Sequence, residues 1–263
     1  GSTAVQLTQA RVLAAEGFTQ EALATLRSIR IDRDKRSDAK ERQAIEADIR
    51  IGLATQYGAD GNYTEARAQL LQLESTHRAD PLTLARVAGA WSEYGEHSQA
   101  LMAIRSAVAS AKTNRNALRI QQANILLLAE KYEELDVLLE DLNQSRTLTG
   151  EERAALDNIR IGHAVRQADA ARDNGMLLQA SNRLMPLMDQ YQKDARLLAA
   201  YGRVLLAADE VDAANTLYTR LLNDHPTHRD VREGAIQAAL LKRDDRRVMS
   251  LAAQGVQLEP DEA

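Results

Sequence analysis

Residues able to do chemistry are few in this chain and seldom fall close together. The sequence has no cysteine, no Gly-x-Ser-x-Gly turn for a serine nucleophile and no phosphate-cradling loop that ends in Gly-Lys. Its nearest glycine cluster, Tyr57-Gly-Ala-Asp-Gly61, is typical of a turn between helices, where Gly61 supplies the positive φ that ends the first helix. We therefore predict no catalytic centre and no cofactor.

The five histidines include one close pair, His225 and His228, with Asp224 and Asp230 beside them. This set of ligand types allows a surface metal site. Hydrated polar side chains in a turn are the favoured interpretation, because the four residues flank a proline between two predicted helices. The sequence therefore predicts no metal site.

Two arginines offer a different kind of site. Arg196 and Arg203 are seven residues apart, which places them on one face of a helix, where they can hold a carboxylate or a phosphate. The alternative is that they pair with Asp169 or Asp173 of the preceding helix. Sequence alone favours this second interpretation.

The helix that holds these arginines belongs to a repeated unit, DARLLAAYGRVLLAADEVDAANTLYTRLLNDHP, from Asp194 to Pro226. Counted from Ala195, small residues stand at positions 8 and 20 and large ones at 4, 7, 11, 24 and 27, which is the pattern of a tetratricopeptide repeat. Asp194 is placed to cap the first helix, and Pro226 ends the second.

The same spacing predicts six or seven repeats along the chain, starting near Thr3, Ala47, Pro81, Asn116, Ile161, Ala195 and Arg229. A 44% hydrophobic composition with only nine aromatic residues suits closely packed helices better than a sheet. The predicted fold class is therefore all-α, an α-solenoid of helix-turn-helix repeats in one domain over residues 1–263.

Two intervals break the 34-residue period: repeats one and two are 44 residues apart, and repeats four and five are 45 apart. The added segments, 37–46 and 147–160, are charged and have a helical period, and Thr149 and Glu152 form a capping-box pattern. Each segment either lengthens the next first helix or adds an unpaired helix. We expect them to act as hinges between sub-modules 1–36, 47–145 and 161–263; the alternative is long helices in an undisturbed stack.

Most aromatic residues fall on packing positions of the repeat: Tyr57, Tyr63, Trp91, Tyr132, Tyr201 and Tyr218. Phe18, Tyr94 and Tyr191 remain as free platforms, in different repeats. A continuous stacking track for bases or sugars is therefore not expected. Net charge −5 without a basic stripe argues against nucleic acid, and the apolar runs are too short to span a bilayer.

Protein binding is then the expected function, through the concave surface lined by the first helices of the repeats. Repeat positions 2, 5, 9, 12 and 13 point inward there, and the groove is predicted to be mixed in charge. The candidate binding residues are Asn124, Asp169, Arg172, Arg196 and Arg203, and further inward-facing positions include Arg11, Ile120, Leu127, Asp173, Glu233 and Gln237.

A narrower resemblance appears in the second half. The run AVRQADAARDNG, residues 164–175, preceded by LTGEERAALDNIR, residues 148–160, is similar to the repeats of the BcsC-type family of bacterial cellulose synthase and exopolysaccharide export proteins. The likeness covers residues 148–260 well and the first half only as generic repeats. In that family a long repeat array precedes an outer-membrane β-barrel, whose alternating strands this segment lacks.

The resemblance implies a non-catalytic scaffold in the periplasm that links an inner-membrane synthase to an export pore. Its expected partners are other proteins of a polysaccharide synthesis and export complex, with weaker contacts to peptidoglycan or polysaccharide and membrane contact only through the barrel. The alternative is a cytosolic adaptor that binds a peptide of a partner protein in its concave groove. An enzyme remains possible only if a domain outside the segment supplies the chemistry; Gly1-Ser2 is typical of a cloning remnant.

Overall fold

The computed structural model describes residues 3–30, 35–77 and 80–258, so Gly1 and Ser2 lie outside the described residues. The described residues form fourteen α-helices and no strand. The helices are α1 (Thr3–Ala15), α2 (Thr19–Ser28), α3 (Arg36–Ala59), α4 (Tyr63–Thr76), α5 (Pro81–Glu93), α6 (His97–Ser110), α7 (Arg115–Leu128), α8 (Tyr132–Gln144), α9 (Gly150–Asp173), α10 (Leu177–Gln190), α11 (Ala195–Ala207), α12 (Val211–Asp224), α13 (Arg229–Leu241) and α14 (Asp245–Leu258).

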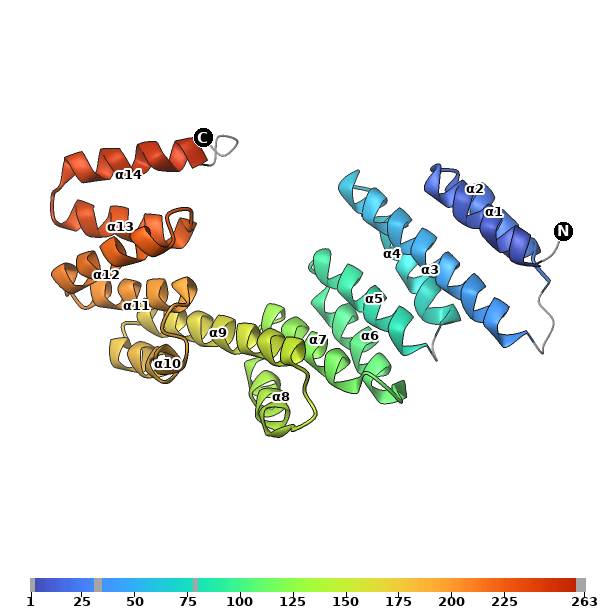
Figure 1. Ribbon diagram of the computed structural model, residues 1–263, viewed down its shortest axis with the longest axis horizontal. Coiled ribbons are helices and arrows are strands. Elements are labelled where there is room, and N and C mark those ends of the chain that lie inside the picture. The colour runs from blue at the N-terminus through green and yellow to red at the C-terminus, as the bar shows by residue number, and fades with distance from the viewer. Residues whose placement is uncertain (1–2, 31–34, 78–79, 259–263) are drawn as a thin grey trace. The chain divides into compact units, whose positions relative to one another are not determined.

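These helices form seven consecutive helix-turn-helix pairs, α1–α2 to α13–α14, which are visible as hairpins along the coloured ribbon (Figure 1). Most pairs pack internally, and first helices also pack on the next first helix, as α1 does on α3 and α11 on α13. In the fifth pair, Ala168 of α9 shares a buried cluster with Leu184 of α10 and Leu197 of α11. The predicted all-α solenoid of tetratricopeptide type is confirmed.

The chain divides into two compact units, residues 1–153 and 154–263, called unit 1 and unit 2 below. Unit 1 has a buried cluster of α1, α2 and α3 that includes Leu7, Leu26 and Ile49. Unit 2 has a core that includes Tyr218 and Leu251. The division falls within the predicted inserted segment 147–160, and the three sub-modules with their hinges stay a prediction.

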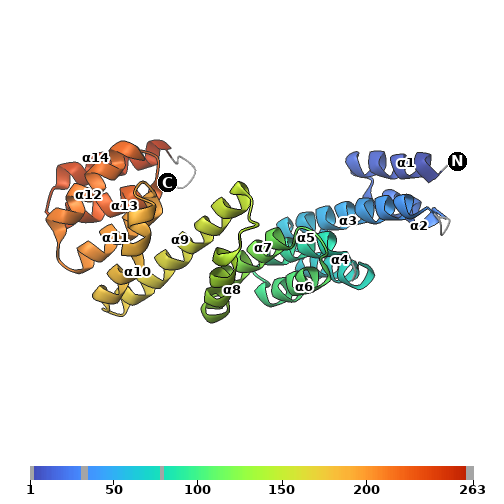
Figure 2. The ribbon, with the colours of Figure 1, turned by 60° about the horizontal axis from the view of Figure 1, so that its bottom comes forward.

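Both inserted segments lengthen a first helix. The helices α3 and α9 have 24 residues each, against 13 in α1, α5, α11 and α13, a difference of about three turns. Both appear as long, straight ribbons in the rotated view (Figure 2). The capping box of α9 is present: the Thr149 hydroxyl accepts from the Glu152 amide at 3.1 Å, and the Glu152 carboxylate accepts from the Thr149 amide at 2.9 Å.

Every first helix is followed, two positions after its last residue, by a residue with positive φ. Four of these residues are glycine, but Glu130, Asp209 and Arg243 take the same position in repeats four, six and seven, with φ of 55°, 62° and 56°. The next amide then bonds back across the turn, as Glu210 N–H does to the Leu205 carbonyl at 2.9 Å. This is the bond of a Schellman motif, which favours glycine at the left-handed residue. Three turns thus hold a side chain where none is preferred.

We expect Asp209→Gly to raise the free energy of unfolding by about 0.5–1 kcal/mol, because glycine adopts the left-handed conformation without a clash of Cβ. Urea unfolding followed by circular dichroism measures the change. The matched control is Ala208→Gly, one residue earlier at φ −85°, which should destabilise. A loss of stability in Asp209→Gly would contradict the idea that the left-handed conformation of Asp209 is strained.

Three aromatic predictions need correction. Tyr94, expected to be free, donates its hydroxyl to the Ala54 carbonyl and packs its ring on Gly58 of the previous repeat. Tyr191 is only partly exposed, and burial together with Asp157 raises its pKa to about 12. Tyr63, expected to pack, is 61% exposed. Only Phe18 of the three expected platforms has an exposed ring, at 51%.

Candidate partner-binding groove

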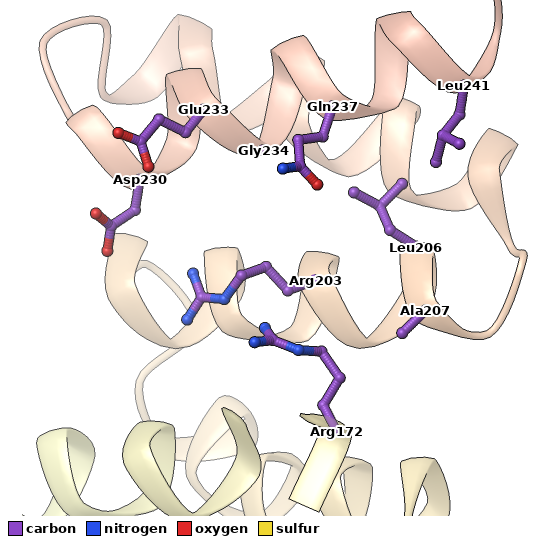
Figure 3. A pocket seen from close by; sticks show the side chains of 9 residues that line it. All are labelled: Arg172, Arg203, Leu206, Ala207, Asp230, Glu233, Gly234, Gln237 and Leu241. Carbon is purple, nitrogen blue, oxygen red and sulfur yellow. The ribbon is translucent and has the colours of Figure 1, made fainter. Parts of the chain in front are cut away.

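A groove of about 630 Å³ lies in unit 2 between the first helices α9, α11 and α13. Figure 3 shows its three kinds of lining: guanidinium groups on α9 and α11, acidic and amide groups on α13, and an apolar end. The lining residues are Arg172, Arg203, Leu206, Ala207, Asp230, Glu233, Gly234, Gln237 and Leu241. This groove is called the α11–α13 groove below.

The basic wall is organised by one carboxylate. Asp169 of α9 accepts two hydrogen bonds from Arg203 of α11, at 3.0 and 2.8 Å, and one from Arg172 at 2.6 Å. Arg172 also bonds to the neighbouring Asp173 at 2.7 Å. Two parallel N–H···O bonds fix the plane of the Arg203 guanidinium. The alternative of pairing across repeats is therefore what the structure shows for Arg203.

Charge around Arg203 also affects its protonation. Burial lowers the pKa of Arg203, but Asp169 and, more weakly, Asp230 outweigh burial, so the pKa is raised overall. The guanidinium is therefore a permanent cation with a carboxylate behind it on α9 and another on α13. It is a rigid, charged edge of the groove.

The acidic wall is looser. Asp230 and Glu233 are exposed side chains of the first turns of α13 and point into the groove from the side opposite the arginines (Figure 3). Glu233 accepts from Arg229 at 2.9 Å, with both side chains more than half exposed. Such surface pairs contribute at most about 1 kcal/mol, so the Glu233 carboxylate is available to a ligand.

The far end of the groove is apolar, and a buried tyrosine separates the two helices that form its walls. Leu206 of α11 and Leu241 of α13 face each other there, and Leu241 is 58% exposed (Figure 3). The wholly buried ring of Tyr218 from α12 lies against Gly202 of α11 and against Gly234 of α13, which lines the groove. Its hydroxyl donates to the Ala199 carbonyl at 2.8 Å, and burial raises the pKa of Tyr218 to about 12. This ring sets the spacing between the two walls.

The remaining predicted site residues are not lining residues of this groove. Arg196 bonds to its own helix cap, Asp194, at 2.8 Å and to Asn158 of α9 at 3.0 Å. Asp194 also accepts from the amides of Arg196 and Leu197, as predicted for a cap. Burial raises the pKa of Asp194, but the Arg196 side chain and these two amides outweigh burial, so the pKa is lowered overall. Asn124 is an exposed residue of α7 in unit 1.

Two inward-facing predictions are wrong in exposure, because Ile120 and Leu127 of α7 are each only 7% exposed and belong to the core. Glu233 and Gln237 of the groove are among the inward-facing residues predicted from the sequence. Asp230 is a groove residue that the prediction lacks, although it stands at position 2 of the last repeat, which is an inward-facing position.

Within the described ranges 3–30, 35–77 and 80–258, no group of three or more His, Asp or Glu side chains is arranged to hold a metal ion. Within the same ranges, no helix combines the length and the apolar character that crossing a membrane requires.

No family model matches the sequence. The chain is 28% identical over 208 residues to cellulose synthase operon protein C of Pseudomonas fluorescens, covering 79% of this chain and 16% of that protein. It is 32% identical over 171 residues to the protein of the same name from Xanthomonas axonopodis pv. citri, covering 64% of this chain and 11% of that protein. The chain thus spans only a small part of the length of these relatives.

Among solved structures, the C-terminal part of a TPR repeat-containing protein from Cytophaga hutchinsonii superposes with a TM-score of 0.52 at 15% identity, covering 97% of this chain and 96% of that one. At this identity the likeness concerns the fold. The chain is therefore a tetratricopeptide-type solenoid that is similar in sequence to part of cellulose synthase operon protein C.

Proposed function

We propose that the chain is a non-catalytic interaction scaffold of a cellulose secretion protein, located in the periplasm, where it links the inner-membrane synthase to the export pore. The observation on which the proposal depends is the α11–α13 groove, with its ordered basic wall, exposed acidic wall and apolar end. This combination provides charge and apolar contacts to a partner protein, and the similarity to cellulose synthase operon protein C supplies the biological setting.

The chemistry of the groove supports binding over catalysis. Its charged side chains are arginine and carboxylate, and Asp169 already neutralises part of the basic wall. Groups held in ion pairs of this kind orient a partner and fix its register. The lining residues include no serine, histidine or lysine, and the only groups there that could act as a general base are the carboxylates of Asp230 and Glu233, which face guanidinium groups.

A secretion assay tests the proposal in the bacterium that makes this chain, with the full protein carrying Asp230→Lys and Glu233→Lys. We expect cellulose outside the cells to fall about tenfold, because the reversed acidic wall repels the partner. Cellulose synthesis by isolated inner membranes should be unchanged. The matched control is Asp189→Lys with Asp224→Lys, two exposed carboxylates on the second helices α10 and α12 of the same unit.

Location is tested separately with an epitope inserted in the exposed turn at Asn174. In spheroplasts, added protease should remove the epitope while a cytosolic marker stays intact. An epitope protected until the inner membrane is lysed would contradict the periplasmic location and favour the cytosolic adaptor.

In the secretion assay, an amount of secreted cellulose equal to wild type in the Asp230→Lys, Glu233→Lys variant would contradict the proposed role of the groove.

A further inference from the structure

The α11–α13 groove has an uneven charge distribution. Three guanidinium groups, those of Arg172, Arg203 and Arg229, stand around it. Four carboxylates balance them, those of Asp169, Asp173, Asp230 and Glu233. One negative charge is therefore in excess, and it lies on the α13 wall.

The groove is unfavourable for binding a carboxylate of a ligand, although two arginines line it. The Arg203 guanidinium is already occupied by both oxygens of Asp169, and Arg172 shares Asp169 and bonds to Asp173. An anionic ligand must displace these intramolecular bonds, and it also meets Asp230 and Glu233 across the groove (Figure 3). The like charges make that approach unfavourable.

A cation meets the opposite situation. Within the described part of the chain, the Asp230 carboxylate accepts no hydrogen bond and forms no ion pair; it interacts electrostatically with Arg203 and Tyr218. Glu233 can exchange its solvent-exposed contact with Arg229 for another donor. Lys or Arg side chains donate three or five N–H groups, which suits two neighbouring carboxylates.

The rest of the groove suits an extended chain. Gln237 lies on α13 between the acidic pair and the apolar end, and its amide can donate to and accept from a peptide backbone (Figure 3). Leu206 and Leu241 then offer apolar surface beyond it. A peptide in extended form advances about 3.3 Å per residue, so a cation and an apolar side chain a few residues apart can reach both ends.

We propose that the α11–α13 groove binds an extended segment of a partner protein that carries a lysine or arginine side chain near an apolar residue. The cation lies between Asp230 and Glu233, and the apolar residue lies on Leu206 and Leu241. This proposal rests on the proposed function of partner binding and specifies which side chain of the partner is recognised.

Fluorescence anisotropy with labelled, end-blocked peptides tests this specificity on the purified chain. The probe set is Gly-Ser-Lys-(Ser)n-Leu-Ser-Gly with one to three spacer serines, the same peptides with Glu in place of Lys, and the same peptides with Ser in place of Leu. We expect saturable binding of at least one Lys-Leu peptide, and at least about tenfold weaker binding of its Glu and Ser counterparts.

Variants of the acidic wall make the test specific to the groove. Asp230→Asn with Glu233→Gln keeps the shape and should weaken the Lys-Leu peptide about tenfold, whereas Asp224→Asn with Asp189→Asn on α12 and α10 removes an equal charge elsewhere and should change nothing. Glu233→Lys should reverse the preference, so that the Glu-Leu peptide binds better. Circular dichroism of each variant confirms that it is folded.

Three results would overturn the proposal: no saturable binding by any Lys-Leu peptide, equal or tighter binding of the Glu-Leu peptide to the unchanged chain, or an unchanged affinity after neutralisation of Asp230 and Glu233. Each outcome leaves the secretion assay as an independent test of the scaffold function. If the peptides fail while the reversed groove still blocks secretion, the groove binds a partner of another chemistry.

Discussion

Gly234→Ala is expected to lower the free energy of unfolding of unit 2 by about 3 kcal/mol, the cost of overpacking a core that cannot relax. A Cβ at residue 234 would lie 2.2 Å from Cζ and 2.3 Å from Cε1 of Tyr218. The Tyr218 ring is wholly buried, and its hydroxyl is held by the Ala199 carbonyl at 2.8 Å. The ring therefore cannot move aside without losing that hydrogen bond.

The same ring blocks the helix on its other side. A Cβ at Gly202 would lie 2.5 Å from Cζ of Tyr218, so Gly202→Ala is expected to destabilise by a comparable amount. Between these glycines the ring acts as a spacer that fixes how closely α11 and α13 approach. Because the two helices are the walls of the α11–α13 groove, a variant that pushes them apart should also weaken the peptide that binds there.

Urea unfolding followed by far-ultraviolet circular dichroism measures both variants. The control is Gly255→Ala in α14, where an added Cβ meets Arg232 at an ordinary 3.4 Å and helix propensity predicts a gain of about 1 kcal/mol. Combined with Gly234→Ala, Tyr218→Val should lower the free energy of unfolding by less than the sum of the two single losses, since the shorter side chain removes the clash with the added Cβ. Additive effects of the two substitutions would contradict the spacer role.

The repeat spacing in the sequence predicts which residues face the α11–α13 groove. Repeat spacing alone places Arg203, Leu206 and Ala207 at positions 9, 12 and 13 of their repeat, and all three line the groove. Asp230 and Glu233, at positions 2 and 5 of the next repeat, lie there as well. Period therefore determines which residues face the groove, because each repeat folds as the same pair of helices.

Ion pairs and packing contacts between repeats are harder to predict from the sequence. That Asp169 serves both Arg172 and Arg203 depends on how α9 and α11 cross, which a period does not state. Tyr94 is a similar case: it stands just after its helix, outside the packing positions, yet its ring fills the space left by Gly58 in the previous repeat. A small residue in one repeat therefore determines whether a large side chain of the next repeat is packed or exposed.

Trp91→Phe in unit 1 is expected to lower the free energy of unfolding by about 2 kcal/mol at neutral pH. The indole of Trp91 is wholly buried and donates its N–H to a carboxylate oxygen of Glu74 at 2.6 Å. Phenylalanine keeps most of the apolar contact but has no donor. A partly buried carboxylate then loses its hydrogen bond, which costs more than the loss of a neutral pair.

The pH dependence of this variant separates the hydrogen bond from packing. Burial raises the pKa of Glu74 above its ordinary value of 4.5, and the bond from Trp91 lowers it in part. With a raised pKa the folded state takes up a proton, so stability is greatest below the unfolded pKa and falls as pH rises through the folded pKa. Removal of the indole donor raises the pKa of Glu74 further and should steepen that fall.

Glu74→Gln provides the matched control, because its amide oxygen still accepts from Trp91 and has no charge to lose. In the Glu74→Gln background, Trp91→Phe should cost less and show little change between about pH 4 and pH 8. In the background with Glu74 intact, the cost should be larger at the higher pH. If Trp91→Phe lowers the free energy of unfolding equally at both pH values and in both backgrounds, the loss comes from the smaller volume of the ring. The hydrogen bond to Glu74 would then contribute nothing to the packing of Trp91 between α4 and α5.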